Sequence, residues 1–271
     1  IGGLAGSIGA FTILDAGVLT MQNLGQNYFG IISGGGGITR TNNDATARIS
    51  TITNLNTYTG PTSIITNGSN NVTNRINVTT LANAGQPRGI GAATRDAANL
   101  VINTVNASGG LGFIGLSNSS TDRLMTIGAS SAATTTAAPA AIWADGLVQG
   151  SVVPTVSFTG TGPVAFTASN QNSTLMLRGQ NLGNNTFNPQ ITNNGTGVVN
   201  VTKVERSTWV LGGANTFTGA VNILAGVGSD ANNSFTGGAL VVTHDQALGT
   251  SAGGVTIAAF PNTTNPAGSG T

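Results

Sequence analysis

One pentapeptide pattern occurs twice in this chain, and it constrains the fold more than any other feature of the sequence. Asn56-Thr57-Tyr58-Thr59-Gly60 returns as Asn215-Thr216-Phe217-Thr218-Gly219, an offset of 159 in sequence number (215 − 56). The same offset aligns residues 32–37 with residues 191–196. A unit of this length is too long for one coil of a solenoid, so it indicates a super-repeat of several coils, with one full copy and part of a second in this chain. The residues that we expect to share a repeated structural role are Asn56, Tyr58, Gly60, Asn215, Phe217 and Gly219.

Short β-rich runs alternate with clusters of Gly, Asn, Ser and Thr along the chain, and helical periodicity is nearly absent. Typical runs are residues 49–52, 76–81 and 220–224, while residues 92–99 could form one helical turn or a loop. A single coil of this composition cannot bury its apolar side, but stacked coils bury a continuous core. We therefore predict an all-β, elongated β-solenoid over residues 1–258, with coils of roughly 20–25 residues and about 11–13 coils in total. Residues 259–271 have the composition of a low-complexity tail or linker.

The shortage of charge suits stacked strands and excludes several classes of partner. Charged residues make up 6% of the chain, against about 25% in a typical globular domain. Identical charges repeated up a stack would repel one another, whereas Asn, Ser and Thr can form hydrogen-bonded ladders. The net charge of +1 gives no attraction to nucleic acid, and the chain has neither cysteine nor an 18-residue apolar run. We therefore expect no nucleic-acid partner, no disulfide and no transmembrane segment.

The second copy of the pentapeptide carries a wider resemblance. Trp209-Val210-Leu211-Gly212-Gly213-Ala214 leads directly into Asn215, and this combination resembles the hallmark of the autotransporter-associated β-strand repeat family. The resemblance adds Trp209 to the structural motif. It implies a right-handed parallel β-helix that serves as the passenger or stalk of a secreted bacterial protein, located outside the cell or on its surface. It implies no particular activity.

A search for reactive side chains predicts neither an active site nor a metal or cofactor site. His244 is the only histidine, and the eight acidic residues are scattered, so metal clusters, catalytic triads and paired carboxylates find no support. We expect His244 to lie in a turn before residues 246–249. We expect Asp122 and Arg123 to form a local ion pair that holds a loop.

Two functions agree with these features, and neither is enzymatic. The first is a structural protein, namely a stalk, sheath or filament built by coil stacking, with the chain itself as partner through end-to-end assembly. The alternative is an adhesin that binds glycans or surfaces through side loops. The candidate loop is an insertion around residues 128–150, in which Trp143 is the candidate residue for surface binding.

Overall fold

The computed structural model describes residues 11–22, 25–42, 46–66, 74–104, 109–128, 140–225 and 238–259. In these residues the chain forms short β-strands and one turn of 3-10 helix, η1 (Ala97–Asn99). The prediction of an all-β fold is therefore confirmed. The 3-10 turn lies within residues 92–99, where the sequence allows one helical turn.

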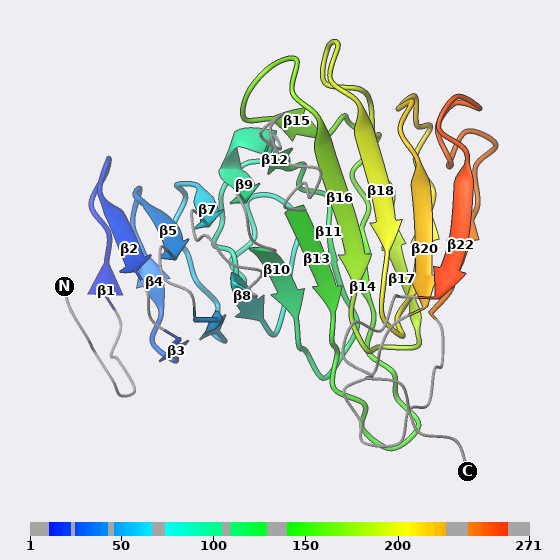
Figure 1. The fold of residues 1–271 in the computed structure, drawn as a ribbon. Helices are drawn as coiled ribbons and strands as arrows, with labels where there is room; N and C mark the ends of the chain where they lie inside the picture. Colours follow the sequence, from blue (N-terminus) through cyan, green and yellow to red (C-terminus); the bar gives the residue numbers. More distant parts are fainter. Residues whose placement is uncertain are drawn as a thin grey trace.

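All strand pairs in the described residues are parallel, and most strands belong to three long sheets (Figure 1). The nine-stranded sheet contains, in spatial order, β3 (Asn27–Tyr28), β6 (Arg48–Ile52), β8 (Asn74–Val78), β10 (Gly109–Phe113), β13 (Ala140–Ala144), β16 (Ser173–Arg178), β18 (Val199–Lys203), β20 (Val221–Ala225) and β22 (Val255–Ala259). The six-stranded sheet contains β2 (Val18–Gln22), β5 (Gly37–Asn42), β7 (Thr62–Thr66), β9 (Leu100–Thr104), β12 (Thr126–Ile127) and β15 (Ala165–Phe166). The five-stranded sheet contains β11 (Ser119–Thr121), β14 (Val156–Phe158), β17 (Asn184–Phe187), β19 (Thr208–Leu211) and β21 (Leu240–Val242), and β1 (Phe11–Thr12) pairs separately with β4 (Ile32–Ser33).

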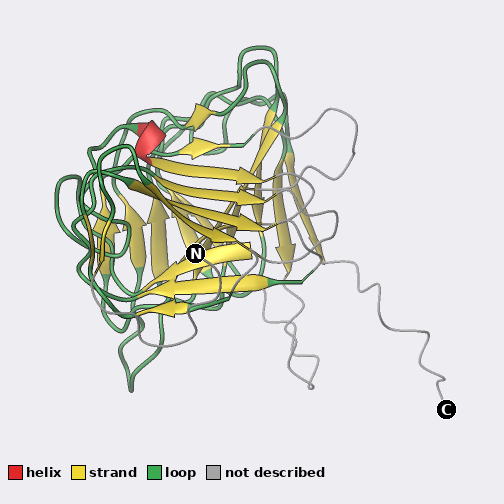
Figure 2. Ribbon diagram, turned by 90° about the vertical axis from the view of Figure 1, so that its left-hand side faces the viewer, coloured by secondary structure: helices red, strands yellow, loops and turns green. Residues whose placement is uncertain are grey.

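Successive coils visit the sheets in a constant order, which makes the chain a parallel β-solenoid. One coil runs through β11, β12 and β13, and the next runs through β14, β15 and β16, each strand pairing with its counterpart. The colours of Figure 1 accordingly run from blue to red along the stack, so residues close in sequence lie in the same or adjacent coils. Figure 2 looks at the stack from its N-terminal side and shows the strands surrounding a common interior.

The coils are longer and more variable than the sequence analysis predicted. Ile52 pairs with Val78, an offset of 26 in sequence number (78 − 52), but Val78 pairs with Phe113, an offset of 35 (113 − 78). Lys203 pairs with Ile223, where the offset is only 20 (223 − 203). The longest sheet of the described residues has nine strands. Most of these strands have five residues, so the difference in coil length lies mainly in the connections between them.

The core is a stack of inward-facing apolar side chains, one set from each coil. In the nine-stranded sheet Ile76, Leu111, Ile142 and Leu177 lie in register on consecutive strands, and all are buried. Alternation along each strand places their neighbours on the outer face. Burial of an Ile or Leu side chain contributes about 1.5–3 kcal/mol, and the stack repeats that contribution in every coil.

Asparagine side chains connect one coil to the next, at corners of the solenoid and within strand β17. The Asn56 Oδ1 atom accepts a hydrogen bond from the Ile32 amide at 2.9 Å, and the Asn215 Oδ1 atom accepts one from the Ile191 amide at 2.8 Å. Asn185 does the same with the Val156 amide at 3.0 Å. These three asparagines are buried, so each satisfies backbone groups that water does not reach.

The two copies of the pentapeptide make similar contacts, although the first lies between β6 and β7 and the second between β19 and β20, which belong to different pairs of sheets. Tyr58 and Phe217 are buried, and each ring is covered by a glycine of the following coil with a left-handed backbone, Gly91 (φ +72°) and Gly249 (φ +74°). A Cβ atom at either glycine would clash with the backbone carbonyl oxygen of the aromatic residue. In both copies the backbone amide of the residue that follows the left-handed glycine donates a hydrogen bond to the carbonyl oxygen of the aromatic residue, at 2.7 Å for the first copy and 2.9 Å for the second.

The glycines that close the two pentapeptides also meet the preceding coil. A Cβ atom at Gly60 would clash with the backbone of Gly36, and one at Gly219 would clash with the Val199 carbonyl oxygen. Close backbone approach therefore requires glycine at both positions. The super-repeat at an offset of 159 and the domain limits at positions 258 and 259 stay predictions.

Candidate functional site

Trp143, the candidate for surface binding, lies in strand β13 and not in a side loop. Residues 129–139 of the expected insertion lie outside the described residues, but residues 140–144 pair along their whole length with β10. The loop assignment was wrong for these residues because Ala140, Ile142 and Ala144 face the core, where small and apolar side chains fit the stack. Trp143 is on the opposite face and is 3% exposed.

The Trp143 ring lies between two guanidinium groups on the outer face of the nine-stranded sheet. The Arg75 Cζ atom is 5.3 Å from the ring centroid and the Arg178 Cζ atom is 4.9 Å from it, distances that allow cation–π attraction. Between Arg75 and Trp143 runs strand β10, whose residues at this place are Gly110 and Gly112. Their lack of side chains leaves room for the ring on the sheet. Trp143 therefore presents no open ring face of the kind that stacks against sugars.

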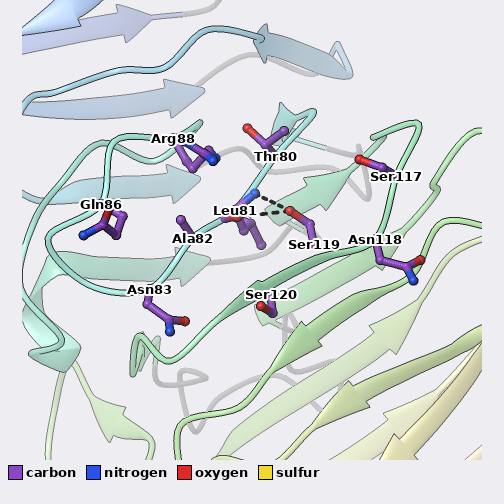
Figure 3. A pocket seen from close by; sticks show the side chains of 10 residues that line it. All are labelled: Thr80, Leu81, Ala82, Asn83, Gln86, Arg88, Ser117, Asn118, Ser119 and Ser120. Carbon is purple, nitrogen blue, oxygen red and sulfur yellow. Dashed lines mark hydrogen bonds between the residues drawn. The ribbon is translucent and has the colours of Figure 1, made fainter.

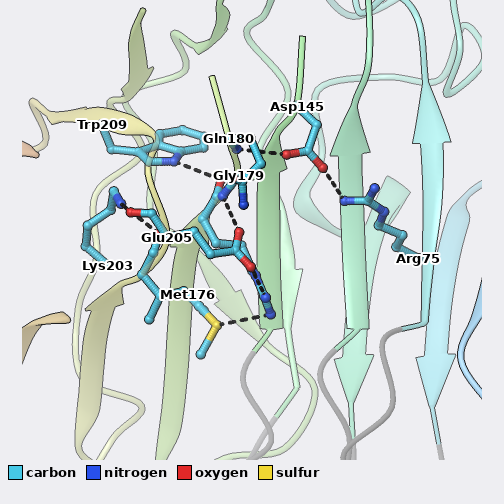
Figure 4. A network of polar contacts seen from close by, with 10 residues as sticks. Arg75, Asp145, Met176, Gly179, Gln180, Lys203, Glu205 and Trp209 are labelled. Carbon is cyan, nitrogen blue, oxygen red and sulfur yellow. Dashed lines mark hydrogen bonds and ion pairs between the residues drawn. The ribbon is translucent and has the colours of Figure 1, made fainter. Parts of the chain in front are cut away.

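Two carboxylates complete this outer-face network (Figure 4). The Arg75 Nη1 atom lies 2.5 Å from the Asp145 Oδ2 atom, and the Asp145 Oδ1 atom accepts from the Gln180 amide at 2.9 Å. Arg178 forms an ion pair with Glu205, whose Oε2 atom accepts from the Gly179 amide at 2.8 Å. The Asp145 carboxylate thus connects Arg75 to the backbone of another coil, whereas Glu205 holds Arg178 together with the backbone of the next residue. The charges are paired and partly buried, which indicates a structural role for this network.

Lys203 belongs to the same region but points into the core. Its strand position is in register with Leu177 and Ile223, and its side chain is fully buried. The ammonium group donates to the Val204 carbonyl at 2.7 Å and to the Glu205 carbonyl at 2.8 Å, where Glu205 has a left-handed backbone (φ +64°). Burial lowers the pKa of Lys203 to about 8, because the surroundings disfavour the charged form.

A polar groove lies at the corner where the chain leaves the nine-stranded sheet for the five-stranded one (Figure 3). The residues that line this groove, of about 370 Å³, are Thr80, Leu81, Ala82, Asn83, Gln86, Arg88, Ser117, Asn118, Ser119 and Ser120. We call it the corner groove. Arg88 is the only charged residue among them, and none is aromatic.

A slip in register creates the corner groove. Val78 pairs with Phe113 at an offset of 35 (113 − 78), but the Ser119 Oγ atom meets the Leu81 amide at 2.7 Å and the Leu81 carbonyl at 3.1 Å, an offset of 38 (119 − 81). The later coil therefore has three more residues than the earlier one at this corner. The extra length projects outward around residues 116–118, where Leu116, Ser117 and Asn118 are exposed.

The hydrogen bonds around the corner groove leave it rich in donors. The Asn83 Oδ1 atom accepts from the Asp122 amide at 3.1 Å, and the Asn118 Oδ1 atom accepts from the Thr155 amide at 2.9 Å. Because both oxygens are engaged, the amide NH₂ groups are the ends that remain for a ligand. The Thr80 Oγ1 atom is buried and has no hydrogen-bond partner within the described part of the protein. No feature of the sequence analysis pointed to this groove, since its residues meet only through the pairing of two coils.

The remaining candidate residues of the sequence have structural surroundings. His244 is exposed in a turn, as expected, and its Nδ1 atom accepts from the Gln246 amide at 3.0 Å. The expected ion pair between Asp122 and Arg123 is wrong. The Arg123 guanidinium turns into the core and donates to the carbonyls of Ile90, Gly91 and Ala93, while the Asp122 Oδ1 atom accepts from the Ala84 amide. The motif residue Trp209 is buried, and its indole N–H donates to the Arg178 carbonyl at 3.1 Å.

Two other kinds of feature are absent from the described part of the chain. It contains no group of three or more His, Cys, Asp or Glu side chains that could hold a metal ion. Among the same residues, no helix is long and apolar enough to cross a membrane.

The fold and the buried asparagine contacts define this chain as a parallel β-solenoid. Over 164 residues, 60% of its length, it is 36% identical to the protein named adhesin BmaC autotransporter from Brucella suis biovar 1 (strain 1330). The chain spans only 4% of the length of that protein. No family model matches the chain, so the autotransporter-associated β-strand repeat assignment stays a resemblance. No solved structure matches it either.

Proposed function

We propose that this chain is a stiff segment of an adhesin-like passenger protein displayed on a bacterial surface. The observation that carries the proposal is the unbroken stack of parallel coils together with the similarity to an autotransporter adhesin. A solenoid of this kind holds binding features at a distance from its point of attachment, and its few charges suit repeated stacking. The role is one of spacing and contact, without catalysis.

An attachment assay tests the adhesive part of the proposal. Beads coated with the purified chain should bind epithelial monolayers or immobilised extracellular matrix more strongly than beads coated with albumin. A β-solenoid of similar length and net charge from an unrelated protein provides the matched control. Equal attachment of the two solenoids would contradict the adhesive role and leave only the role of a spacer.

End-to-end assembly is a second candidate function, and the last described coil supports it. Strand β22 pairs with β20 on one side and, among the described residues, with no strand on the other. Its side chains include Val255 and Ile257, and Ile257 is 79% exposed. An apolar strand at the edge of a sheet can pair with a further strand, including one from another chain.

Sedimentation velocity tests this assembly. Wild-type chain should form elongated particles that grow with concentration, and Ile257→Lys should reduce them to monomers, because a charge at an edge opposes pairing. Leu182→Lys is the matched control, since Leu182 is also exposed but lies at a corner outside the edge strand. A wild-type chain that stays monomeric at high concentration would exclude end-to-end assembly.

A further inference from the structure

We propose that the corner groove binds an acidic sugar unit, that is, a saccharide that carries a carboxylate or a sulfate. This inference rests on the proposed adhesive function and names the class of ligand. The groove volume of about 370 Å³ lies at the lower end of the ~300–1,000 Å³ range of small-ligand pockets, which suits one or two sugar rings.

The side-chain amides of the groove offer donors to a ligand. Asn83 and Asn118 both line the groove and use their side-chain oxygens on the backbone of the adjacent coil, so the side-chain groups that they have left for a ligand are N–H donors. Their orientation is fixed by bonds between coils and exists before any ligand arrives. A ligand that fits such a site must offer acceptors.

The groove carries one positive charge, that of Arg88. The Arg88 Nη1 atom donates to the Pro87 carbonyl at 2.8 Å, which anchors the guanidinium while its other N–H groups stay available. No carboxylate is among the residues that line the groove, and the nearby Asp122 carboxylate accepts from the Ala84 amide. A donor-rich groove with one uncompensated cation favours an anionic ligand, because a charge-assisted hydrogen bond is about twice as strong as a neutral one.

The rest of the groove surface is mostly polar. The side chains of Gln86, Ser117 and Ser120 are exposed at the groove and make no hydrogen bond within the described part of the protein. The Thr80 Oγ1 atom is buried there without a partner among the same residues, which is costly unless a ligand or water satisfies it. Hydroxyl and amide groups of this kind match the hydroxyl groups of a sugar. An apolar ligand would find only Leu81 and Ala82.

Calorimetric titration with defined oligosaccharides tests the inference. The ligands are an oligogalacturonate for the carboxylate, a heparin oligosaccharide for the sulfate and a dextran oligosaccharide as the neutral comparison. We expect at least one acidic oligosaccharide to bind more tightly than dextran, and Arg88→Gln to weaken that binding roughly tenfold, because a hydrogen bond to a charged group is lost. The two acidic ligands identify which acid the groove prefers.

Arg95→Gln is the matched control, since Arg95 is exposed, carries the same charge and does not line the groove. It should change the affinity less than twofold. Ser120→Glu is a second variant at an exposed lining position, and its added carboxylate should weaken binding of the acidic ligand by repulsion. If Arg88→Gln fails to fold, Ser120→Glu still tests whether the groove binds the acidic ligand.

Three outcomes overturn the inference: no acidic ligand binds better than dextran, Arg95→Gln weakens binding as much as Arg88→Gln, or Ser120→Glu has no effect. The bead assay separates this failure from failure of the proposed function. Beads that attach to cells equally well with Arg88→Gln would leave the adhesive role intact and remove the groove from it. If the chain binds the acidic oligosaccharide but beads coated with it do not attach to cells, the adhesive role would be contradicted while the groove would keep its ligand.

Discussion

Replacing Asn215 with alanine should destabilise the second half of the solenoid by breaking a connection between three coils. The Asn215 side chain accepts from the Ile191 amide at 2.8 Å and donates to the Ala247 carbonyl at 2.6 Å. Ile191 and Ala247 are both buried, so Asn215→Ala leaves a donor and an acceptor without partners. An unsatisfied buried group costs about 1–3 kcal/mol, and two of them give a loss of about 2–6 kcal/mol in the free energy of unfolding.

Asn172→Ala provides the control, because Asn172 makes the same kind of bond in an exposed place. Its Oδ1 atom accepts from the Val198 amide at 2.8 Å, but water can replace it there. We expect a loss below about 1 kcal/mol. The comparison thus isolates burial from the simple deletion of an asparagine.

Urea unfolding followed by circular dichroism measures the two losses, and hydrogen exchange shows where they act. A solenoid can unfold in parts, so a global transition alone could hide a local effect. Exchange should become faster in peptides that contain Ile191 and Ala247 and should stay unchanged in peptides from residues 74–104. Equal losses for Asn215→Ala and Asn172→Ala would refute the idea that buried asparagines hold the coils together.

Three further predictions follow from the same contacts. Gly249→Ala should lower the free energy of unfolding by about 2 kcal/mol or more, because the added Cβ would lie 2.5 Å from the Phe217 carbonyl oxygen in a left-handed backbone. Gly254 also has a positive φ, but nothing lies within 4 Å of an added Cβ there. Gly254→Ala should therefore cost only about 1–2 kcal/mol, as measured by urea unfolding. The pKa of Lys203 in the folded chain, about 8, lies below its value in the unfolded chain, so the unfolded chain binds more protons between about pH 8 and pH 10.5. The free energy of unfolding should therefore rise with pH over that range. Urea unfolding at several pH values should show this rise in the wild-type chain and not in Lys203→Met. Trp143→Ala should lower the free energy of unfolding by about 3–5 kcal/mol, measured by thermal or urea unfolding, because the ring is buried between two arginines. Bead attachment by the folded variant should stay unchanged. Loss of attachment without loss of stability would instead support a binding role for Trp143.

The repeated pentapeptide allowed the general fold to be predicted, because its residue types have direct physical consequences. Asparagine at positions 56 and 215 bonds to the backbone of the preceding coil, and the aromatic residue two positions later fills the core. The spacing of short β-rich runs then indicates stacking. The sequence did not reveal the lengths of individual coils, since those depend on how many residues the corners absorb.

The charged residues of the interior could not be predicted in the same way. Lys203 and Arg123 have ordinary neighbours in sequence, yet both are buried and both donate to backbone carbonyls near sharp turns. The farthest of those carbonyls belongs to Ile90, in another coil, so no local pattern records the contact. Trp143 was misplaced for a related reason: the Ala-rich stretch around it looks like a loop until the facing strand β10, with its glycines, is known.

The contrast between strands and corners shows where such a protein can gain a binding site. Paired strands must keep their register, because a slip of one residue would turn every core side chain outward. Corners carry no such restriction, and here three additional residues between Phe113 and Ser119 open a groove without disturbing the pairing of β8 with β10. Polar side chains at the same corner are already fixed by bonds between coils, as Asn83 and Asn118 show. A solenoid can therefore change its ligand at a corner while its core and its stiffness stay the same.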